Sequence, residues 1–173
     1  MRVINRWVLV TMFVVTPAMA AAQTESDSSL FWDVTKGVVL DPTTYAPAVF
    51  AYTSMKMDWD SSQPLFRNGW VEQNHRFTTS GRAFDTPLTY AEGNRKIRQM
   101  ALLHLQESVV NNVAANLFEG VLSDRHPGHR KLFKTLSWVE RIAFSSYVSY
   151  LASASHFKQA QQNRELAAQF GYR

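Results

Sequence analysis

The chain has 173 residues, with 18 Lys and Arg against 14 Asp and Glu, and it contains no cysteine. The lack of cysteine excludes disulfide bonds, thiolate metal sites, a cysteine nucleophile and the acylated cysteine of a lipoprotein. Removing Arg2 and Arg6 with the predicted signal lowers the net charge from +4 to +2. So small a surplus does not indicate a dedicated nucleic-acid-binding protein.

The N-terminal segment 1–20 has the three parts of a secretory signal peptide. Arg2 and Arg6 give a positive start, and residues 7–15 (WVLVTMFVV) form an uncharged, mostly apolar run. That run is short against the roughly 20 residues of a bilayer-spanning helix. Ala18-Met19-Ala20 fits a signal-peptidase site, with Ala22 as the alternative. We expect residues 1–20 to be cleaved and the protein to be periplasmic or extracellular, with contact to the inner-membrane surface left open.

Residues 21–34 are predicted to be a flexible leader, because residues 23–29 (QTESDSS) are polar and short of apolar side chains. Residues 35–173 have the usual size of one domain. The longest uncharged stretches, 42–55 and 142–155, have 14 residues each. Because a spanning helix needs roughly 20, we expect none in the mature chain.

The first predicted helix begins at Asp41-Pro42. Asp41 is a good N-cap, and proline is tolerated at the first helical position. Apolar residues then recur at spacings of three and four, the period of one helix face. Those residues are Tyr45, Ala48, Val49, Tyr52, Met55 and Trp59.

The second predicted helix covers about residues 90–122. Its apolar stripe is expected to face the core, whereas the side that carries Asn111 and Asn112 is expected to face water. On this assignment Val110→Asp is severely destabilising and Asn111→Asp is nearly neutral. The stripe consists of Leu103, Val110, Ala114, Leu117 and Val121.

The third predicted helix covers about residues 130–169, after a turn at Pro127-Gly128. Its near-heptad apolar stripe favours packing along a neighbouring helix, and Arg141 falls opposite that stripe, where we expect it to be solvated. From about residue 158 the composition becomes polar, and we expect this helical tail to extend past the core. The stripe consists of Leu132, Leu136, Val139, Ala143, Tyr147, Tyr150, Ala154 and Phe157.

These elements predict an all-α fold, a small bundle of about three long helices. Between the first two lies an irregular segment, residues 61–89, with two prolines, two glycines and no helical period. Connections of this length are often functional. Four aromatic residues could anchor it to the helices: Phe66, Trp70, Phe77 and Phe84.

The region 58–82 is therefore where we look first for a site. Two nearby carboxyls can act as an acid–base pair if burial raises the pKa of one of them. The catalytic candidates are Asp58, Asp60, Glu72 and His75. The binding candidates are Arg67, Trp70, Asn74, Arg76 and Arg82.

Metal and cofactor signals are weak. Glu72 and His75 have the Glu-x-x-His spacing of carboxylate-bridged di-iron bundles, but the chain has a single copy. His126 and His129 lack the further donors of a zinc site. No nucleophile elbow, phosphate loop or dinucleotide fingerprint is present. We predict neither a metal nor a cofactor.

The stretch from Asp58 to Asn74 resembles a pattern in small uncharacterised bacterial helical proteins. That pattern is an acidic residue ahead of Ser or Thr pairs, then Gly, then Glu-x-Asn-Pro. Here it reads Asp58-Trp-Asp-Ser-Ser, then Gly69 and Glu72-Gln-Asn, with His75 in place of proline. The strongly apolar spanning helices of that group are missing, and the resemblance implies no catalytic role.

Two functions remain open. The leading hypothesis is a non-enzymatic exported domain that acts by contact with a protein or with a membrane surface. Basic residues around the 125–134 turn, with Phe133 and Trp138 nearby, would suit docking on anionic lipid. The alternative is an enzyme or small-ligand binder that uses the region 58–82. Convergence of the candidate residues on one concave pocket would favour the alternative.

The export signal is directly testable. Expressed in a bacterial host, the protein should be recovered from the periplasm beginning at Ala21 or, with the alternative cleavage site, at Gln23. Intact-mass measurement would show which. Recovery of the full-length chain from the cytoplasm would contradict the prediction.

Overall fold

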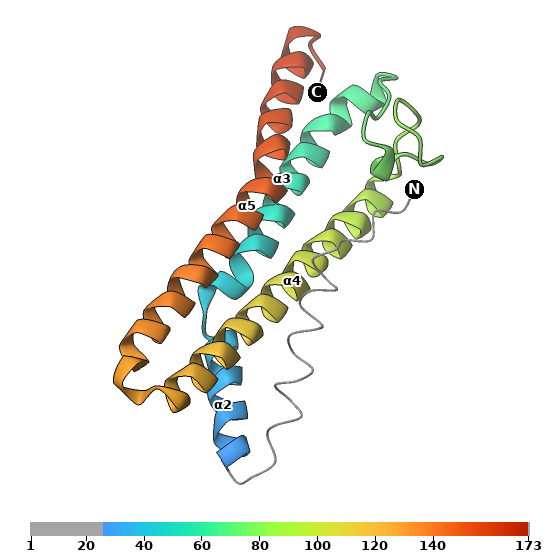
Figure 1. Cartoon of the computed structure of the whole chain (residues 1–173). Helices are drawn as coiled ribbons and strands as arrows, with labels where there is room; N and C mark the ends of the chain where they lie inside the picture. Colours follow the sequence, from blue (N-terminus) through green and yellow to red (C-terminus); the bar gives the residue numbers. More distant parts are fainter. Residues whose placement is uncertain (1–25, 173) are drawn as a thin grey trace. The chain divides into compact units, whose positions relative to one another are not determined.

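A computed structural model describes residues 26–172 (Figure 1). The helices are α2 (Ser26–Val39), α3 (Pro42–Arg67), α4 (Tyr90–Arg125) and α5 (Arg130–Gln169), with short 3-10 turns η1 (His75–Phe77) and η2 (Pro127–His129). The predicted signal peptide, 1–20, lies outside the described residues. Residues 26–34, which we expected to be flexible, form the first part of α2, and Val34 is buried.

The all-α prediction is confirmed. All three predicted helices are present, as α3, α4 and α5. Between α3 and α4 the chain is irregular, with isolated bridges between Glu72 and Asp85 and between Thr78 and Pro87. None of the helices in the described part of the chain is long and apolar enough to cross a bilayer.

One boundary differs, since α3 continues through Pro64 to Arg67. Pro64 has no N–H for the helical ladder. Side chains beside it bond to backbone carbonyls a turn earlier: Ser61 and Ser62 donate to Asp58 O at 2.8 and 2.9 Å, and Gln63 donates to Trp59 O at 2.9 Å. Residues 61–67 are therefore helical, and the irregular connection begins at Asn68.

The described residues divide into two compact units. Unit 1 contains residues 26–45 and 106–146, and unit 2 contains residues 46–105 and 147–172. Helical segments pack together within each unit.

Polar side chains hold unit 1 together. Asp41 caps α3 as predicted, because its Oδ1 accepts the Thr43 N–H at 2.9 Å. Buried Asn112 of α4 donates to the hydroxyl of Thr44 at 2.7 Å, and that hydroxyl donates to Val38 O of α2 at 2.7 Å. This chain of bonds connects α2, the start of α3 and α4.

Arg141 of α5 completes the interior of unit 1. Its Nε donates to Asp41 Oδ2 at 2.8 Å, and its Nη1 lies 2.6 Å from Ser137 Oγ and 3.7 Å from Glu119 Oε2. The prediction that Arg141 is solvated is wrong. The guanidinium is buried, where two carboxylates compensate its charge.

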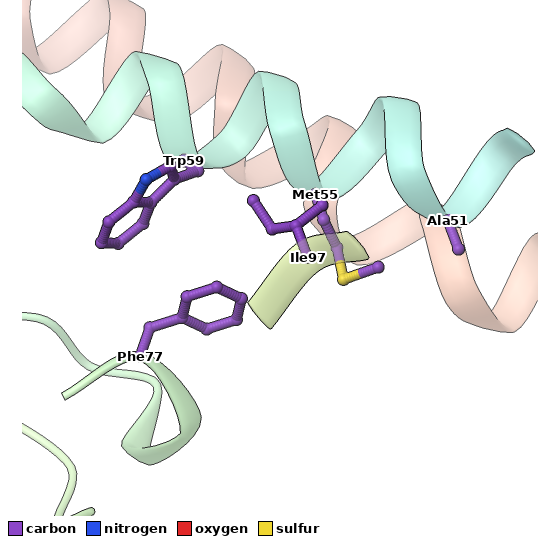
Figure 2. Close-up of a cluster of buried hydrophobic side chains, with 5 residues drawn as sticks. All are labelled: Ala51, Met55, Trp59, Phe77 and Ile97. Carbon is purple, nitrogen blue, oxygen red and sulfur yellow. The ribbon is translucent and has the colours of Figure 1, made fainter. Parts of the chain in front are cut away.

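Unit 2 contains the main apolar core (Figure 2). Trp59 of α3 belongs to this core, and its ring centroid lies 5.4 Å from that of Phe77 and 5.5 Å from that of Phe66. Ile97 of α4 is fully buried beside it. Gly93 makes room for the indole, because a Cβ there would lie 2.2 Å from Trp59 Cε2. The core also includes Ala51 and Met55, with Leu88, Met100 and Ala152 packed against it.

The irregular connection is attached to this core through Phe77. Of the four aromatic anchors that we predicted, Phe77 is buried and Phe66 is half-buried, whereas Phe84 is 70% exposed. Leu88 N donates to Phe77 O at 2.7 Å, and the backbones of Glu72 and Asp85 exchange two hydrogen bonds. These bonds fold the segment back on itself and fix Glu72 at the start of the fold-back.

The face assignment of the third predicted helix is wrong, and those of the first two are wrong in part. In α3, Met55 and Trp59 of the predicted stripe are buried, but Tyr45, Val49 and Tyr52 are exposed. In α4, Ser108 and Asn112 are buried, whereas Leu103 is 57% and Val110 46% exposed. Small or polar residues also line the buried side of α5: Ser137, Arg141, Ser145, Ser149, Ser153, Ala160, Asn163 and Ala167. Most of the predicted stripe of α5 is exposed: Leu132, Leu136, Val139, Tyr147, Tyr150 and Phe157.

Close approach of the backbones explains this reversal. Small side chains let helices pack closely. A buried serine hydroxyl can donate its hydrogen bond to a backbone carbonyl one turn earlier in the same helix, as Ser153 Oγ does to Ser149 O at 2.6 Å. In unit 1 a Cβ on Gly37 would lie 2.6 Å from Asn116 Oδ1. The helices therefore meet through their small faces, and their larger apolar side chains remain outside.

The reversal predicts which α4 substitutions destabilise unit 1. Asn112→Leu should lower the free energy of unfolding by about 1–3 kcal/mol, because it removes the donor to the buried Thr44 hydroxyl. Val110→Asp should cost less than about 1 kcal/mol, because Val110 is half-exposed. Urea unfolding would measure both. Greater destabilisation by Val110→Asp would restore the original face assignment.

Candidate functional site

A cavity of about 240 Å³ lies in unit 2. One side is α3, a second is the residue 70–77 segment, and a third is the C-terminal part of α5. Its polar lining includes Asp58, Ser62, Glu72, Gln73, Asn74, Ser155, His156, Gln159 and Asn163. Its apolar lining includes Met55, Trp59, Leu65, Phe66, Trp70, Val71, Phe77 and Leu166.

Asp58 is the central polar group of this cavity. Its Oδ2 lies 2.7 Å from His156 Nδ1, and its Oδ1 accepts from Asn163 Nδ2 at 3.1 Å. An ionised carboxylate only accepts hydrogen bonds, so the proton of this pair belongs on Nδ1. That arrangement orients the imidazole and leaves Nε2 to bond with another group.

Asn163 orients Asp58 from α5. Its side-chain amide is buried and donates to Ser62 Oγ at 2.8 Å, while its Oδ1 accepts from Gln159 Nε2 at 3.0 Å. Residues 156, 159 and 163 follow one another at spacings of three and four, which places them on one helix face. The polar tail of α5, which we expected to extend past the core, therefore packs against α3.

Glu72 is the second carboxylate of the cavity. Burial raises the pKa of Glu72 above its usual 4.5. The Asn74 N–H donates to Glu72 Oε1 at 2.7 Å and counteracts part of this rise in pKa, whereas the negative charge of Asp58 adds to it. The pKa of Glu72 therefore depends on the charges of Asp58 and His156.

The structure brings together part of the predicted site. The cavity is lined by Asp58 and Glu72 of the catalytic candidates and by Trp70 and Asn74 of the binding candidates. Asp60 is two residues from Asp58, about 200° around the helix, and pairs instead with Lys56 and the Tyr90 hydroxyl. The candidates that are exposed and do not line the cavity are Arg67, His75, Arg76 and Arg82.

Among the cavity residues that were not predicted are His156, Gln159 and Asn163 of α5. Their helical spacing in the polar tail was a visible signal, but nothing in the sequence placed that tail beside Asp58. Within the described residues, no group of three or more His, Asp and Glu could hold a metal ion. Glu72 and His75 do not form the ligand pair that their spacing suggested, since His75 does not line the cavity.

Comparisons of the chain with protein-family models, curated proteins and solved structures find no match. The resemblance of residues 58–74 to small bacterial helical proteins therefore stays a prediction.

The raised pKa of Glu72 gives a pH test. The folded state holds the proton to higher pH than the unfolded chain, so the free energy of unfolding falls as pH rises from about 4.5 through the raised pKa. Glu72→Gln removes this ionisation but keeps an oxygen for the Asn74 N–H. Thermal melts should show Glu72→Gln more stable than the wild type at pH 8 and equal to it at pH 4. A constant difference across this range would contradict the assignment.

Proposed function

We propose that unit 2 binds a small organic cation in the cavity around Asp58 and Glu72. This is the ligand-binding alternative from the sequence, made specific by the charge of the cavity. The observation that carries it is the composition of the lining. Two carboxylates and one histidine are its only ionisable side chains, and neither lysine nor arginine lines it in the described part of the chain.

The aromatic lining favours the same class of ligand. Trp59, Phe66, Trp70 and Phe77 line the cavity. The ring centroids of Phe66 and Phe77 lie 5.4–5.5 Å from that of the Trp59 indole. Aromatic faces attract cations within about 6 Å of the ring centroid, most strongly when water is excluded. A site with carboxylates and aromatic rings suits an ammonium group better than an anion or a neutral sugar.

The size limits the ligand to a small molecule. At roughly 30 Å³ for each liquid water, a volume of about 240 Å³ holds about eight water molecules. Drug-sized sites are usually larger, roughly 300–1,000 Å³. The amides of Gln159 and Asn163 and the free side of the imidazole of His156 can orient polar groups of the ligand. The cavity therefore suits an amine or a methylated ammonium of a few carbon atoms.

Binding is proposed rather than turnover, because the polar groups are committed to one another. Both oxygens of Asp58 already accept hydrogen bonds, one from His156 and one from Asn163. Such a carboxylate contributes fixed negative charge and holds the imidazole in place. Fixed charge in a partly enclosed site is what recognition of a cation requires.

Titration calorimetry with choline and with 3,3-dimethylbutan-1-ol would test this proposal. The alcohol has the shape of choline without its charge, so binding of choline alone is the expected result. Asp58→Asn and Glu72→Gln should each weaken choline binding roughly ten-fold, because loss of one charge contact is worth about 1–2 kcal/mol. Equal binding of both compounds would overturn the proposal. It would also be overturned if neither choline nor any of a panel of small primary amines bound.

Asp60→Asn is the matched control. It removes a carboxylate from the same helix, but Asp60 is half-exposed, is paired with Lys56 and does not line the cavity. Choline affinity should therefore change less than about two-fold, since exposed pairs have small effects. Melting curves of all three variants would separate loss of binding from loss of fold.

The pH dependence of binding has a predicted sign. An ionised Glu72 attracts the cation and a protonated Glu72 does not, so choline affinity should rise as pH increases through the raised pKa of Glu72. In Glu72→Gln this rise should disappear. A pH profile that is unchanged in the variant would assign the titration to another group.

A further inference from the structure

The end of unit 1 where α4 turns into α5 carries a dense group of basic side chains. Residues 124–134 contain four Arg and Lys and one Asp, so their net charge is 4 − 1 = +3 with both histidines neutral. All of these charged residues are exposed. They are Asp124, Arg125, Arg130, Lys131 and Lys134.

The first turns of α5 expose both charged and apolar side chains. An α-helix turns about 100° per residue, so Lys131, Lys134 and Trp138, at spacings of three and four, share one face. Leu132, Leu136 and Val139, at spacings of four and three, share a second face, about 130° further round the helix. The side chains of Trp138 and of these three aliphatic residues are 49–57% exposed. The exposed surface here therefore consists of one basic and aromatic stripe and one aliphatic stripe.

The opposite side of the same turns faces the interior of unit 1. Ser137 is buried and donates to Ala115 O of α4 at 3.2 Å, and buried Arg141 bonds to Asp41. The carboxylates of Asp41 and Glu119 lie against Arg141. The interior is thus electrostatically compensated, and the excess of positive charge is on the outside.

We infer that this end of unit 1, defined by residues 125–139, docks on the surface of an anionic lipid bilayer. Lysine and arginine beside an exposed tryptophan and aliphatic side chains are the pattern of helices that lie in the plane of a membrane interface. The aliphatic stripe would enter the acyl boundary, and the basic stripe would contact lipid headgroups. The net charge of +3 over residues 124–134 complements the negative surface of an anionic bilayer.

Co-sedimentation with vesicles tests the inference on the processed, exported chain. One vesicle population contains phosphatidylcholine with phosphatidylglycerol, and the other contains phosphatidylcholine alone. The expected result is binding to the anionic vesicles that weakens as salt is raised, because exposed charges are screened beyond about 10 Å at 0.1 M salt. Equal binding to both populations, or none to the anionic one at low salt, would overturn the inference.

Three variants locate the surface. Arg130→Gln/Lys131→Gln/Lys134→Gln should weaken partition onto anionic vesicles roughly 100-fold, since each basic residue near the surface contributes roughly five-fold. Leu132→Ser/Leu136→Ser/Val139→Ser should also weaken it while leaving the melting temperature near that of the wild type. The matched control is Arg95→Gln/Lys96→Gln/Arg98→Gln, which removes the same charge from the part of α4 in unit 2.

The control decides between docking and general attraction. Retention of binding in the control, with loss in the first two variants, is the expected pattern. Equal weakening by both charge variants would mean that net charge alone attracts the chain, and would overturn the assigned surface. Light scattering on the free protein tests whether a second copy of the chain, rather than lipid, covers the aliphatic stripe. A concentration-dependent dimer abolished by the serine variant would assign the aliphatic stripe to a second copy of the chain.

Discussion

The carboxylate of Asp58 joins two segments of the chain that are far apart in sequence. It bonds to His156, 98 residues later, and to Asn163, 105 residues later. A charged group in a partly buried position is stable only if hydrogen-bond donors surround it, and here α5 supplies them. Asp58 thus provides the charged contact that holds the polar tail of α5 against α3, and the bond from Asn163 to Ser62 supports it. The cavity exists because that tail is held in place.

The same kind of constraint governs unit 1, where Arg141 takes the role of the buried charge. Asp41, which also caps α3, compensates the guanidinium from across the unit. One carboxylate therefore caps a helix and neutralises a cation. In both units polar contacts specify which faces meet, and apolar burial follows in the space that remains.

Because α4 and α5 bury the faces that carry their small side chains, their larger apolar side chains lie on the surface. Serine, alanine and asparagine remove little apolar area from water, so the larger side chains of α4 and α5 remain exposed in quantity. A large exposed apolar surface marks a site of interaction. The proposed lipid contact of unit 1 accounts for part of this surface. In unit 2, α5 also exposes Tyr147, Tyr150, Leu151 and Phe157.

The proposed ligand-binding cavity and the proposed lipid-docking surface rest on different observations. The cavity is acidic and aromatic, is enclosed by α3, the 70–77 segment and α5, and lies wholly in unit 2. The docking surface is basic and aliphatic and lies wholly in unit 1. If the chain is exported as we expect, a cation-binding protein that also contacts anionic lipid would sample ligands close to the membrane. Each proposal stands if the other fails.

The sequence by itself determined where α3 begins and where α4 and α5 lie, but not that α2 is helical or that α3 continues to Arg67. The Asp41-Pro42 start, the Pro-Gly turn at 127–128 and the stop near Gly171 are local backbone signals, and the helix bounds follow them closely. It also placed half of the site, because Asp58, Glu72, Trp70 and Asn74 all lie between positions 58 and 74. Only the tertiary structure decided which face of each helix is buried. A period of 3.6 residues identifies two faces but not the inner one when the small polar face packs more closely than the apolar face. His156 and Asn163 were hidden for the related reason that their partner, Asp58, is distant in sequence, and only folding brings it into contact.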